Sequence, residues 1–220
     1  MNKKIILTGI IISVIIISTI VIYSPSYVEP ENLDARTIGT ISTTMGSSIL
    51  GNPSAPITIV EFGDYQCHQC YNWFHNTKSS VFQNYVDTGK ANFVFMDLAF
   101  LGRDSPKAAQ ASYCAEDQGK YWEYHDQLYT AQGSQVDNGW ANPERLKAFA
   151  FTLNLDMDSF ENCLDSEKYA KRVQYNIAEA KKLGVNDTPT FFIIGPDGQQ
   201  QKIVGAQPYP VFKQVFDSMI

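Results

Sequence analysis

The chain has 220 residues, which is enough for one large domain or for one domain with an insertion. Its 44% hydrophobic and 13% aromatic content predicts a globular protein with a packed core. The net charge of −6 disfavours a nucleic-acid-binding role, because no basic surface is available to neutralise phosphates. Four cysteines are too few for a scaffold built from disulfides, so their positions along the chain carry the information.

The N-terminus predicts export of the rest of the chain. Lys3 and Lys4 precede an apolar run over 5–22, whose length lies between that of a signal-peptide core and that of a spanning helix. Lysines before the run, with no basic cluster directly after it, predict a folded domain outside the cytoplasm. We interpret residues 1–23 as an uncleaved membrane anchor because no Ala-x-Ala site follows; a cleaved signal peptide, which would leave the domain secreted, is the alternative. Either way the compartment is oxidising.

The first part of the predicted domain is a strand–helix–strand unit. Residues 24–48 are polar and rich in Thr and Ser, which predicts a linker, and the domain is expected over 49–220. The β-branched and apolar residues of 56–63 predict a strand buried on both faces. A helical stretch to about Asp87 and a second buried strand over 92–98 follow, which predicts a βαβ unit with a parallel pair of strands.

Helical patterns then predominate until about Leu183. Strand patterns return at 190–194 and 201–204, and a last helix is expected over 210–219. The sequence therefore predicts an α/β domain that is interrupted by a helical insertion at about 104–184.

A Cys-x-x-Cys pair, Cys67 and Cys70, lies between the first strand and the helix. At a helix start, the first sulfur faces unpaired backbone N–H groups and the positive end of the helix dipole. Both favour the thiolate, which is the attacking and leaving species in disulfide exchange. Half of a zinc site, joined by His68, is the alternative, but the sequence lacks a complete ligand set. We therefore expect no metal and no cofactor.

Three separated segments resemble DsbA-like proteins of the thioredoxin superfamily. They are residues 59–70, which hold the cysteine pair, residues 119–126 (Gly-Lys-Tyr-Trp-Glu-Tyr-His-Asp) and residues 184–192 (Gly-Val-Asn-Asp-Thr-Pro-Thr-Phe-Phe). The likeness runs from about Ile49 to Ile220. It implies a thioredoxin fold with a helical insertion and the activity of a protein-disulfide oxidoreductase.

The resemblance also implies roles for single residues. Cys67 would be the nucleophile and Cys70 the buried resolving cysteine. Pro189 would be a cis-proline against the disulfide, and the backbone of Thr188 would pair with an extended substrate. Glu61 matches the family's acid beneath the active site; a carboxyl in an apolar strand should have a raised pKa and could relay the proton of the second cysteine. A strand residue facing solvent is the alternative for this glutamate.

One position departs from the family pattern. Oxidising members commonly have Pro after the first cysteine and often His before the second, where this chain has His68 and Gln69. A protonated His68 would stabilise the Cys67 thiolate and make the disulfide more oxidising. An exposed, neutral side chain that only reshapes the loop is the alternative.

The two remaining cysteines, Cys114 and Cys163, lie in predicted helices of the insertion. Some DsbA-like proteins have a structural disulfide in this region, so the resemblance implies that the two form one. Two buried free thiols are the alternative.

The leading hypothesis is a monomeric oxidase that donates the disulfide of Cys67 and Cys70 to reduced exported polypeptides. By analogy with the family, a membrane quinone-linked partner would reoxidise it. The alternatives are a disulfide reductase or isomerase, a metal-binding module that uses Cys67, His68 and Cys70, and a non-catalytic peptide-binding or chaperone domain.

Overall fold

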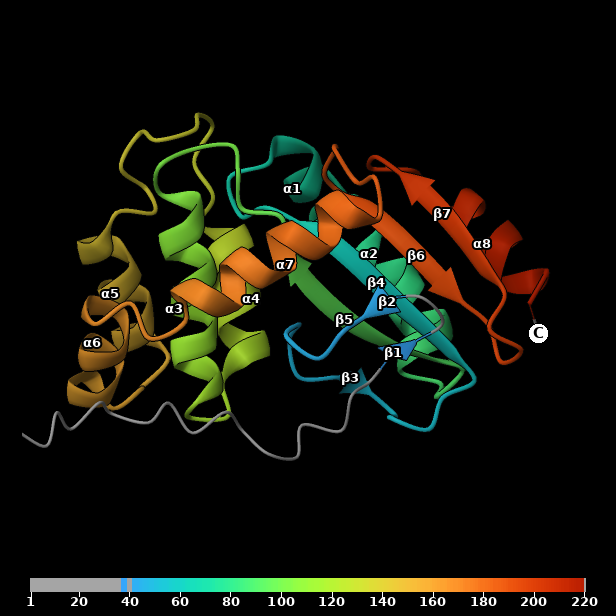
Figure 1. The fold of residues 1–220 in the computed structure, drawn as a ribbon, viewed down its shortest axis with the longest axis horizontal. Coiled ribbons are helices and arrows are strands. Elements are labelled where there is room, and N and C mark those ends of the chain that lie inside the picture. The colour runs from blue at the N-terminus through green and yellow to red at the C-terminus, as the bar shows by residue number, and fades with distance from the viewer. Residues whose placement is uncertain (1–36, 39–40, 220) are drawn as a thin grey trace, which may run out of the picture. The chain divides into compact units, whose positions relative to one another are not determined.

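A computed structural model describes residues 37–38 and 41–219 of the chain (Figure 1). Its strands are β1 (Thr37–Ile38), β2 (Ile41–Ser42), β3 (Leu50–Gly51), β4 (Ile57–Gly63), β5 (Ala91–Asp97), β6 (Thr190–Ile194) and β7 (Gln200–Val204). Its helices are α1 (His68–Asn76), α2 (Lys78–Val81), a π-helical turn η1 (Phe82–Val86), α3 (Ser105–Glu116), α4 (Tyr121–Thr130), α5 (Pro143–Thr152), α6 (Met157–Asp165), α7 (Ala170–Lys182) and α8 (Tyr209–Asp217).

The expected membrane anchor or signal segment, residues 1–23, lies outside the described residues. Among the helices that the structure describes, none is long and apolar enough to cross a membrane.

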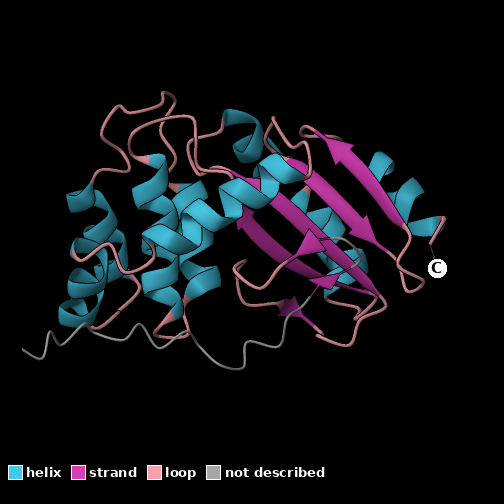
Figure 2. Cartoon of the chain, in the orientation of Figure 1, coloured by secondary structure: helices cyan, strands magenta, loops and turns pink. Residues whose placement is uncertain are grey.

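Five strands form the central sheet in the order β3-β5-β4-β6-β7 (Figure 2). β4 and β5 are parallel, with Glu61 opposite Phe95, and this pair confirms the predicted βαβ unit. β6 runs antiparallel to β4 and places Phe191 on the other side of Glu61. β4 is therefore central, and the residue that follows its end begins the turn into the cysteine pair.

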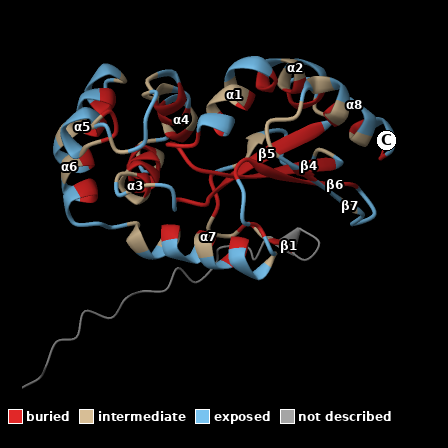
Figure 3. Ribbon diagram, turned by 90° about the horizontal axis from the view of Figure 1, so that it is seen from above, coloured by how far each residue is buried: buried red, intermediate tan, exposed pale blue. Residues whose placement is uncertain are grey.

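The sheet separates two hydrophobic layers. Because side chains alternate along a strand, Ile57 and Ile59 of β4 face one layer and Val60 and Phe62 face the other. Helices α1, α2 and α8 cover the first face, and α7 covers the second (Figure 3). All seven residues of β4 are buried, as the predicted two-sided burial requires.

Helices α3 to α7 lie between β5 and β6 in the chain, so they form the predicted helical insertion. α3 packs against α4, α6 and α7, and its buried face is built from small residues that allow close approach, among them Ala108, Ala111 and Ala115.

The helix expected to continue to about Asp87 is instead divided at Thr77. This residue has φ −122° and ψ −41°, ends α1 and is buried. Its side-chain hydroxyl donates to the carbonyl of Gln207 at 3.2 Å, and such a side-chain bond competes with regular helix.

The end of the expected linker is packed on the domain. Ile41 is fully buried, and the carbonyl of Met45 accepts hydrogen bonds from Asn176 Nδ2 at 2.8 Å and Arg172 Nε at 3.1 Å. The backbone N–H of Ser47 donates to Phe95 of β5. In the structure, residues 41–48 therefore belong to the folded domain, although their sequence is polar.

Candidate active site

Cys67 is the residue that caps the N-terminus of α1. Its sulfur accepts a hydrogen bond from the backbone N–H of Cys70 at 3.3 Å, and its thiol donates to the carbonyl of Thr188 at 3.2 Å. Only 5% of Cys67 is exposed, and none of Cys70. Cys67 therefore lies between the positive end of a helix and the segment that precedes β6.

The surroundings of Cys67 favour its thiolate. Its pKa is lowered to about 6, first by a hydrogen bond from the Cys70 side chain and then by bonds from the Thr188 side chain and from the backbone N–H groups of Cys70 and Gln69. Burial acts in the opposite direction, but it is outweighed. The thiolate is therefore abundant near neutral pH, as an attacking sulfur requires.

Cys70 has the opposite character. Its pKa is raised well above the ordinary value, chiefly by burial and then by the neighbouring Cys67. A thiolate that forms on Cys70 must therefore find a proton nearby.

Glu61 is buried on β4, on the same face as the cysteine pair. Only 1% of the residue is exposed, and neither carboxylate oxygen has a hydrogen-bond partner. Burial raises its pKa well above the ordinary value, while the charge of Lys78 lowers it. The buried arrangement expected for this glutamate is the one observed, and a protonated carboxyl beside Cys70 can supply a proton.

Two side chains that the sequence did not single out as functional contact this region. Tyr129 of α4 is buried, and its pKa is raised first by burial and then by the charges of Cys70 and Glu61. Lys78 of α2 is 8% exposed and pairs with Asp126. A lysine in a polar helical stretch gives no sequence signal of burial.

The segment before β6 lies beside the cysteine pair, as the carbonyl of Thr188 shows. The Thr188–Pro189 peptide bond is cis, and the carbonyl of Pro189 accepts a hydrogen bond from the backbone N–H of Gly205 at 2.8 Å. Both residues are buried. The structure thus brings together Cys67, Cys70 and the two residues expected to receive substrate.

His68 is exposed and lies on the outer side of α1. Its ring stacks on that of Tyr71, with 6.0 Å between centroids. It is not among the groups whose hydrogen bonds lower the pKa of Cys67. Over 37–38 and 41–219, no group of three or more His, Cys, Asp or Glu side chains is placed to hold a metal ion.

The residues before Cys67 fix two loops next to it. The Asp64 carboxylate accepts bonds from the backbone N–H groups of Phe100 and Leu101, at 2.9 and 3.0 Å. The Gln66 amide donates to Asp137 Oδ1 at 3.0 Å and accepts from the backbone N–H of Asp137 at 2.8 Å. These contacts hold the two loops beside Cys67 in place. No local pattern in the sequence predicts them, because the bonded residues are far apart in the chain.

Cys114 and Cys163 form a disulfide that joins α3 to α6. Cys67 and Cys70 are free thiols, so the structure shows the reduced state of the pair.

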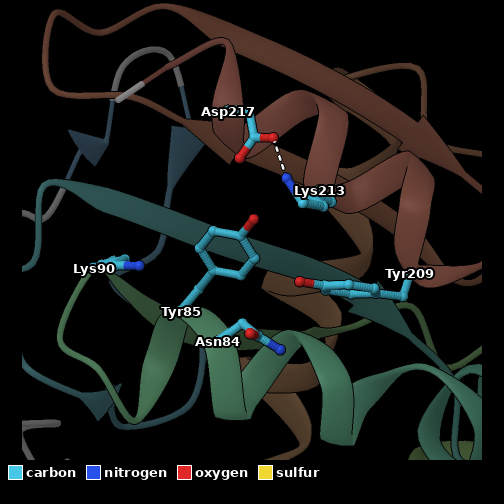
Figure 4. Close-up of a pocket in the computed structure, with 6 residues that line it drawn as sticks. All are labelled: Asn84, Tyr85, Lys90, Tyr209, Lys213 and Asp217. Atoms are coloured by element: carbon cyan, nitrogen blue, oxygen red, sulfur yellow. Dashed lines mark hydrogen bonds and ion pairs between the residues drawn. The ribbon is translucent and has the colours of Figure 1, made fainter.

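A surface pocket lies between η1 and α8 (Figure 4). It is lined by Asn84, Tyr85, Lys90, Tyr209, Lys213 and Asp217. None of the residues described above lines this pocket, so it is separate from the cysteine site.

Comparison with known proteins agrees with this geometry. Residues 43–203 match the family model described as thioredoxin. The chain is 30% identical over 151 residues to disulfide bond formation protein D of Bacillus subtilis, covering 67% of this chain and 68% of that protein.

Solved structures give the same result. The crystal structure of oxidised BdbD from Bacillus subtilis has a TM-score of 0.74 and 26% identity, covering 82% of this chain and 96% of that chain. Alpha-DsbA1 of Wolbachia pipientis has a TM-score of 0.69 and 28% identity, covering 78% of this chain and 89% of that chain. The chain therefore belongs to the thioredoxin family, and within this superfamily it is a DsbA-like protein-disulfide oxidoreductase.

Proposed function

We propose that the protein is an oxidase that introduces disulfides into exported polypeptides by donating the disulfide of Cys67 and Cys70. The observation that carries this direction is the position of the Cys67 sulfur at the start of α1, where it accepts a hydrogen bond from the backbone N–H of Cys70. These surroundings lower the pKa of Cys67 to about 6. A stabilised thiolate stabilises the reduced protein, and a stabilised reduced form makes the disulfide a stronger oxidant.

The exchange proceeds in two steps. A substrate thiolate attacks the sulfur of Cys67, the Cys67–Cys70 bond breaks, and Cys70 leaves with the electron pair. Glu61 gives its proton to Cys70, which favours the thiol because it is fully buried. A second substrate thiolate then attacks the substrate sulfur of the mixed disulfide and releases Cys67 as the thiolate. The substrate loses two electrons, and the cysteine pair gains them.

The Thr188–Pro189 segment is proposed to receive the substrate. In the reduced protein, while Cys67 is protonated, the Thr188 carbonyl accepts a hydrogen bond from its thiol. This bond is absent once Cys67 is in a disulfide, because no thiol hydrogen is left. The carbonyl is then available to an N–H group of an extended polypeptide, and backbone pairing of this kind accepts many sequences.

The decisive measurement is the redox equilibrium of Cys67 and Cys70 against glutathione, read by alkylation and mass. An oxidase should be mostly reduced in buffers that keep ordinary structural disulfides intact. A potential near −270 mV, the value typical of thioredoxin, would exclude the oxidase and favour a reductase. The Cys114→Ala/Cys163→Ala variant is the control, because it leaves a single cysteine pair to titrate.

The exported location and the partners are part of the same proposal. The relatives named disulfide bond formation protein support an extracytoplasmic role. The proposal includes a monomeric oxidase that is anchored through residues 1–23 and a membrane partner that reoxidises the cysteine pair. A membrane-impermeant maleimide should label Cys67 in intact cells after mild reduction. Labelling only after lysis would contradict this location.

A further inference from the structure

Helix α7 has one exposed side, and lysines lie along it. Residues three and four positions apart lie next to each other on the surface of a helix, so exposed residues with this spacing form a continuous stripe. α7 is the outer layer on its face of the sheet (Figure 3). The α7 stripe consists of the exposed residues Lys171, Gln174, Tyr175, Ala178, Lys181 and Lys182.

The α7 stripe is positively charged in a chain whose net charge is −6. The only acidic residue of α7, Glu179, is 5% exposed, and its carboxylate pairs with Lys182 at 3.3 Å. At the C-terminal end of the helix, the ammonium of Lys202 on β7 donates to the carbonyl of Gly184 at 3.1 Å. Four ammonium groups therefore lie along and beside this helix, and no carboxylate of α7 is exposed with them.

The electrostatics of the helix itself explain only part of this pattern. Lys181 and Lys182 lie in the last turn, where the negative end of the helix dipole favours a cation. Lys171 lies in the first turn, where the positive end of the dipole disfavours one. The other cation of that turn, Arg172, is largely buried and pairs with Glu116. An anionic surface outside the domain would offset the unfavourable position of Lys171.

The chain also joins the domain beside the α7 stripe. Tyr175 is 39% exposed, and its hydroxyl donates to Ser42 Oγ at 3.1 Å. The backbone N–H of Ser42 donates to Glu179 Oε1 at 3.4 Å. The segment that follows the expected membrane anchor therefore meets the folded domain at α7. A half-exposed tyrosine among lysines is also typical of a surface that lies at the headgroup level of a membrane.

We propose that the α7 stripe rests on anionic lipid headgroups of the membrane that holds residues 1–23. The lysine ammonium groups pair with lipid phosphates, and the ring of Tyr175 lies at the headgroup level. This inference rests on the anchored location proposed above, but not on the direction of disulfide exchange. Because α1 covers the opposite face of the sheet from α7, this contact leaves the exposed side of α1 open to polypeptides.

The test is lysine acetylation of the full chain in lipid nanodiscs, read by mass spectrometry. One set of discs contains phosphatidylcholine alone, and the other contains phosphatidylcholine and phosphatidylglycerol in equal parts. Acetylation of Lys171, Lys181 and Lys182 should be slower by about fivefold or more in the anionic discs, since each lysine near an anionic surface strengthens the attraction about fivefold. Lys90 and Lys213, which line the pocket beside α8, should react equally in both.

Two double variants, each lacking two positive charges, separate the α7 stripe from general attraction to lipid. In Lys171→Gln/Lys181→Gln the remaining Lys182, which keeps its pair with Glu179, should lose its protection in the anionic discs. In Lys90→Gln/Lys213→Gln that protection should persist. Salt at about 1 M should abolish it, because the Debye length falls to about 3 Å. Equal acetylation of Lys182 in the two kinds of disc, or equal loss in the two variants, would overturn the proposal.

Failure of the anchor is distinguishable from failure of the α7 stripe. A full chain that enters neither kind of disc rejects anchoring through residues 1–23. The same lysines are then followed after vesicles of phosphatidylglycerol or of phosphatidylcholine are added to the full chain. Protection by the anionic vesicles alone supports the lipid-binding face without the anchor, and its absence rejects that face. The glutathione equilibrium of the cysteine pair reports on the oxidase in either case.

Discussion

Two thiols one helical turn apart differ because of what surrounds each sulfur. Cys67 receives hydrogen bonds at the start of a helix, whereas Cys70 is enclosed by apolar side chains and a carboxyl. The first sulfur is thus suited to attack and to leave, and the second must be supplied with a proton.

An ultraviolet titration of the reduced protein should show one thiolate with a midpoint at about pH 6. The signal should vanish in Cys67→Ser. His68→Ala should leave the midpoint in place, because the bonds to the Cys67 sulfur come from Cys70, Thr188 and the backbone. A midpoint that rises clearly in His68→Ala would show instead that the histidine stabilises the thiolate.

Replacing Glu61 by Gln should stabilise the protein at pH 8 but not at pH 4. The contribution of this carboxyl is fully present below its ordinary pKa of 4.5 and is lost as pH rises through the raised pKa of the folded state. Each unit of that rise corresponds to about 1.4 kcal/mol. Urea unfolding of both proteins at the two pH values measures the difference. An equal difference at both values would mean that Glu61 does not titrate abnormally.

The sequence predicts the burial of Glu61 but not that of Lys78. The burial of Glu61 follows from the apolar residues on both sides of it in β4, which is local information. The burial of Lys78 does not follow from local information, because a long side chain on a polar helix can project to solvent or inward. The break between α1 and α2 is not local either, since the Thr77 hydroxyl bonds Gln207, 130 residues away.

At the scale of elements, the loops around the site are held by residues of the cysteine turn itself. Gln66 both donates to Asp137 and accepts from it, which ties the loop of residues 131–142 to α1. Asp137 also accepts from the backbone N–H groups of Arg103 and Asp104, so one side chain joins three segments.

Gln66→Ala should loosen that loop without unfolding the domain. Loss of its hydrogen bonds, each worth about 1 kcal/mol, should speed hydrogen exchange over residues 131–142 by about tenfold. Gln69→Ala is the matched control, since this glutamine is exposed, lies two residues beyond Cys67, and its side chain bonds Asn72 on the same helix. Equal hydrogen-exchange rates over residues 131–142 in the two variants would show that Gln66 does not hold this loop.

The disulfide between α3 and α6 closes a loop within the insertion. Replacing both Cys114 and Cys163 by Ala should lower the free energy of unfolding by about 2–4 kcal/mol, because the unfolded chain regains freedom. Cys67 and Cys70 are unchanged, so peptide oxidation should persist at temperatures where the variant is folded. Urea unfolding with unaltered stability would contradict the prediction.

Helices and strands with a local pattern are predicted from the sequence, whereas segments held by distant residues are not. The strand of residues 190–194 coincides with β6, because a run of buried apolar residues between turns is distinctive. Residues 41–48 were expected as linker because they are polar. Their partners, Arg172 and Asn176, lie more than 120 residues away and leave no local pattern.

For the whole molecule, the state of Cys67 and Cys70 should set the stability of the fold. Ionisation of Cys67 in the folded dithiol adds stability that appears above pH 6 and grows until its ordinary pKa of 9.0 is reached. Between pH 5 and pH 7 the reduced protein should therefore gain about 1 kcal/mol relative to the oxidised protein.

Calorimetry of the Cys114→Ala/Cys163→Ala variant tests this, because only Cys67 and Cys70 then respond to reductant. The melting temperature of the reduced form should rise relative to the oxidised form as the pH increases from 5 to 7. A gap that stays constant would show that the thiolate is not stabilised in the folded protein.

β7 is an edge strand of the central sheet, and an edge strand is a risk for a protein that binds extended polypeptides. An open edge presents unpaired backbone groups on which other chains can add as strands and aggregate. Gln201 and Lys202 are exposed along β7, and the Lys202 ammonium donates to the carbonyl of Gly184. A charged, polar border of this kind discourages β-aggregation, so the protein should remain soluble among unfolded clients instead of co-precipitating with them.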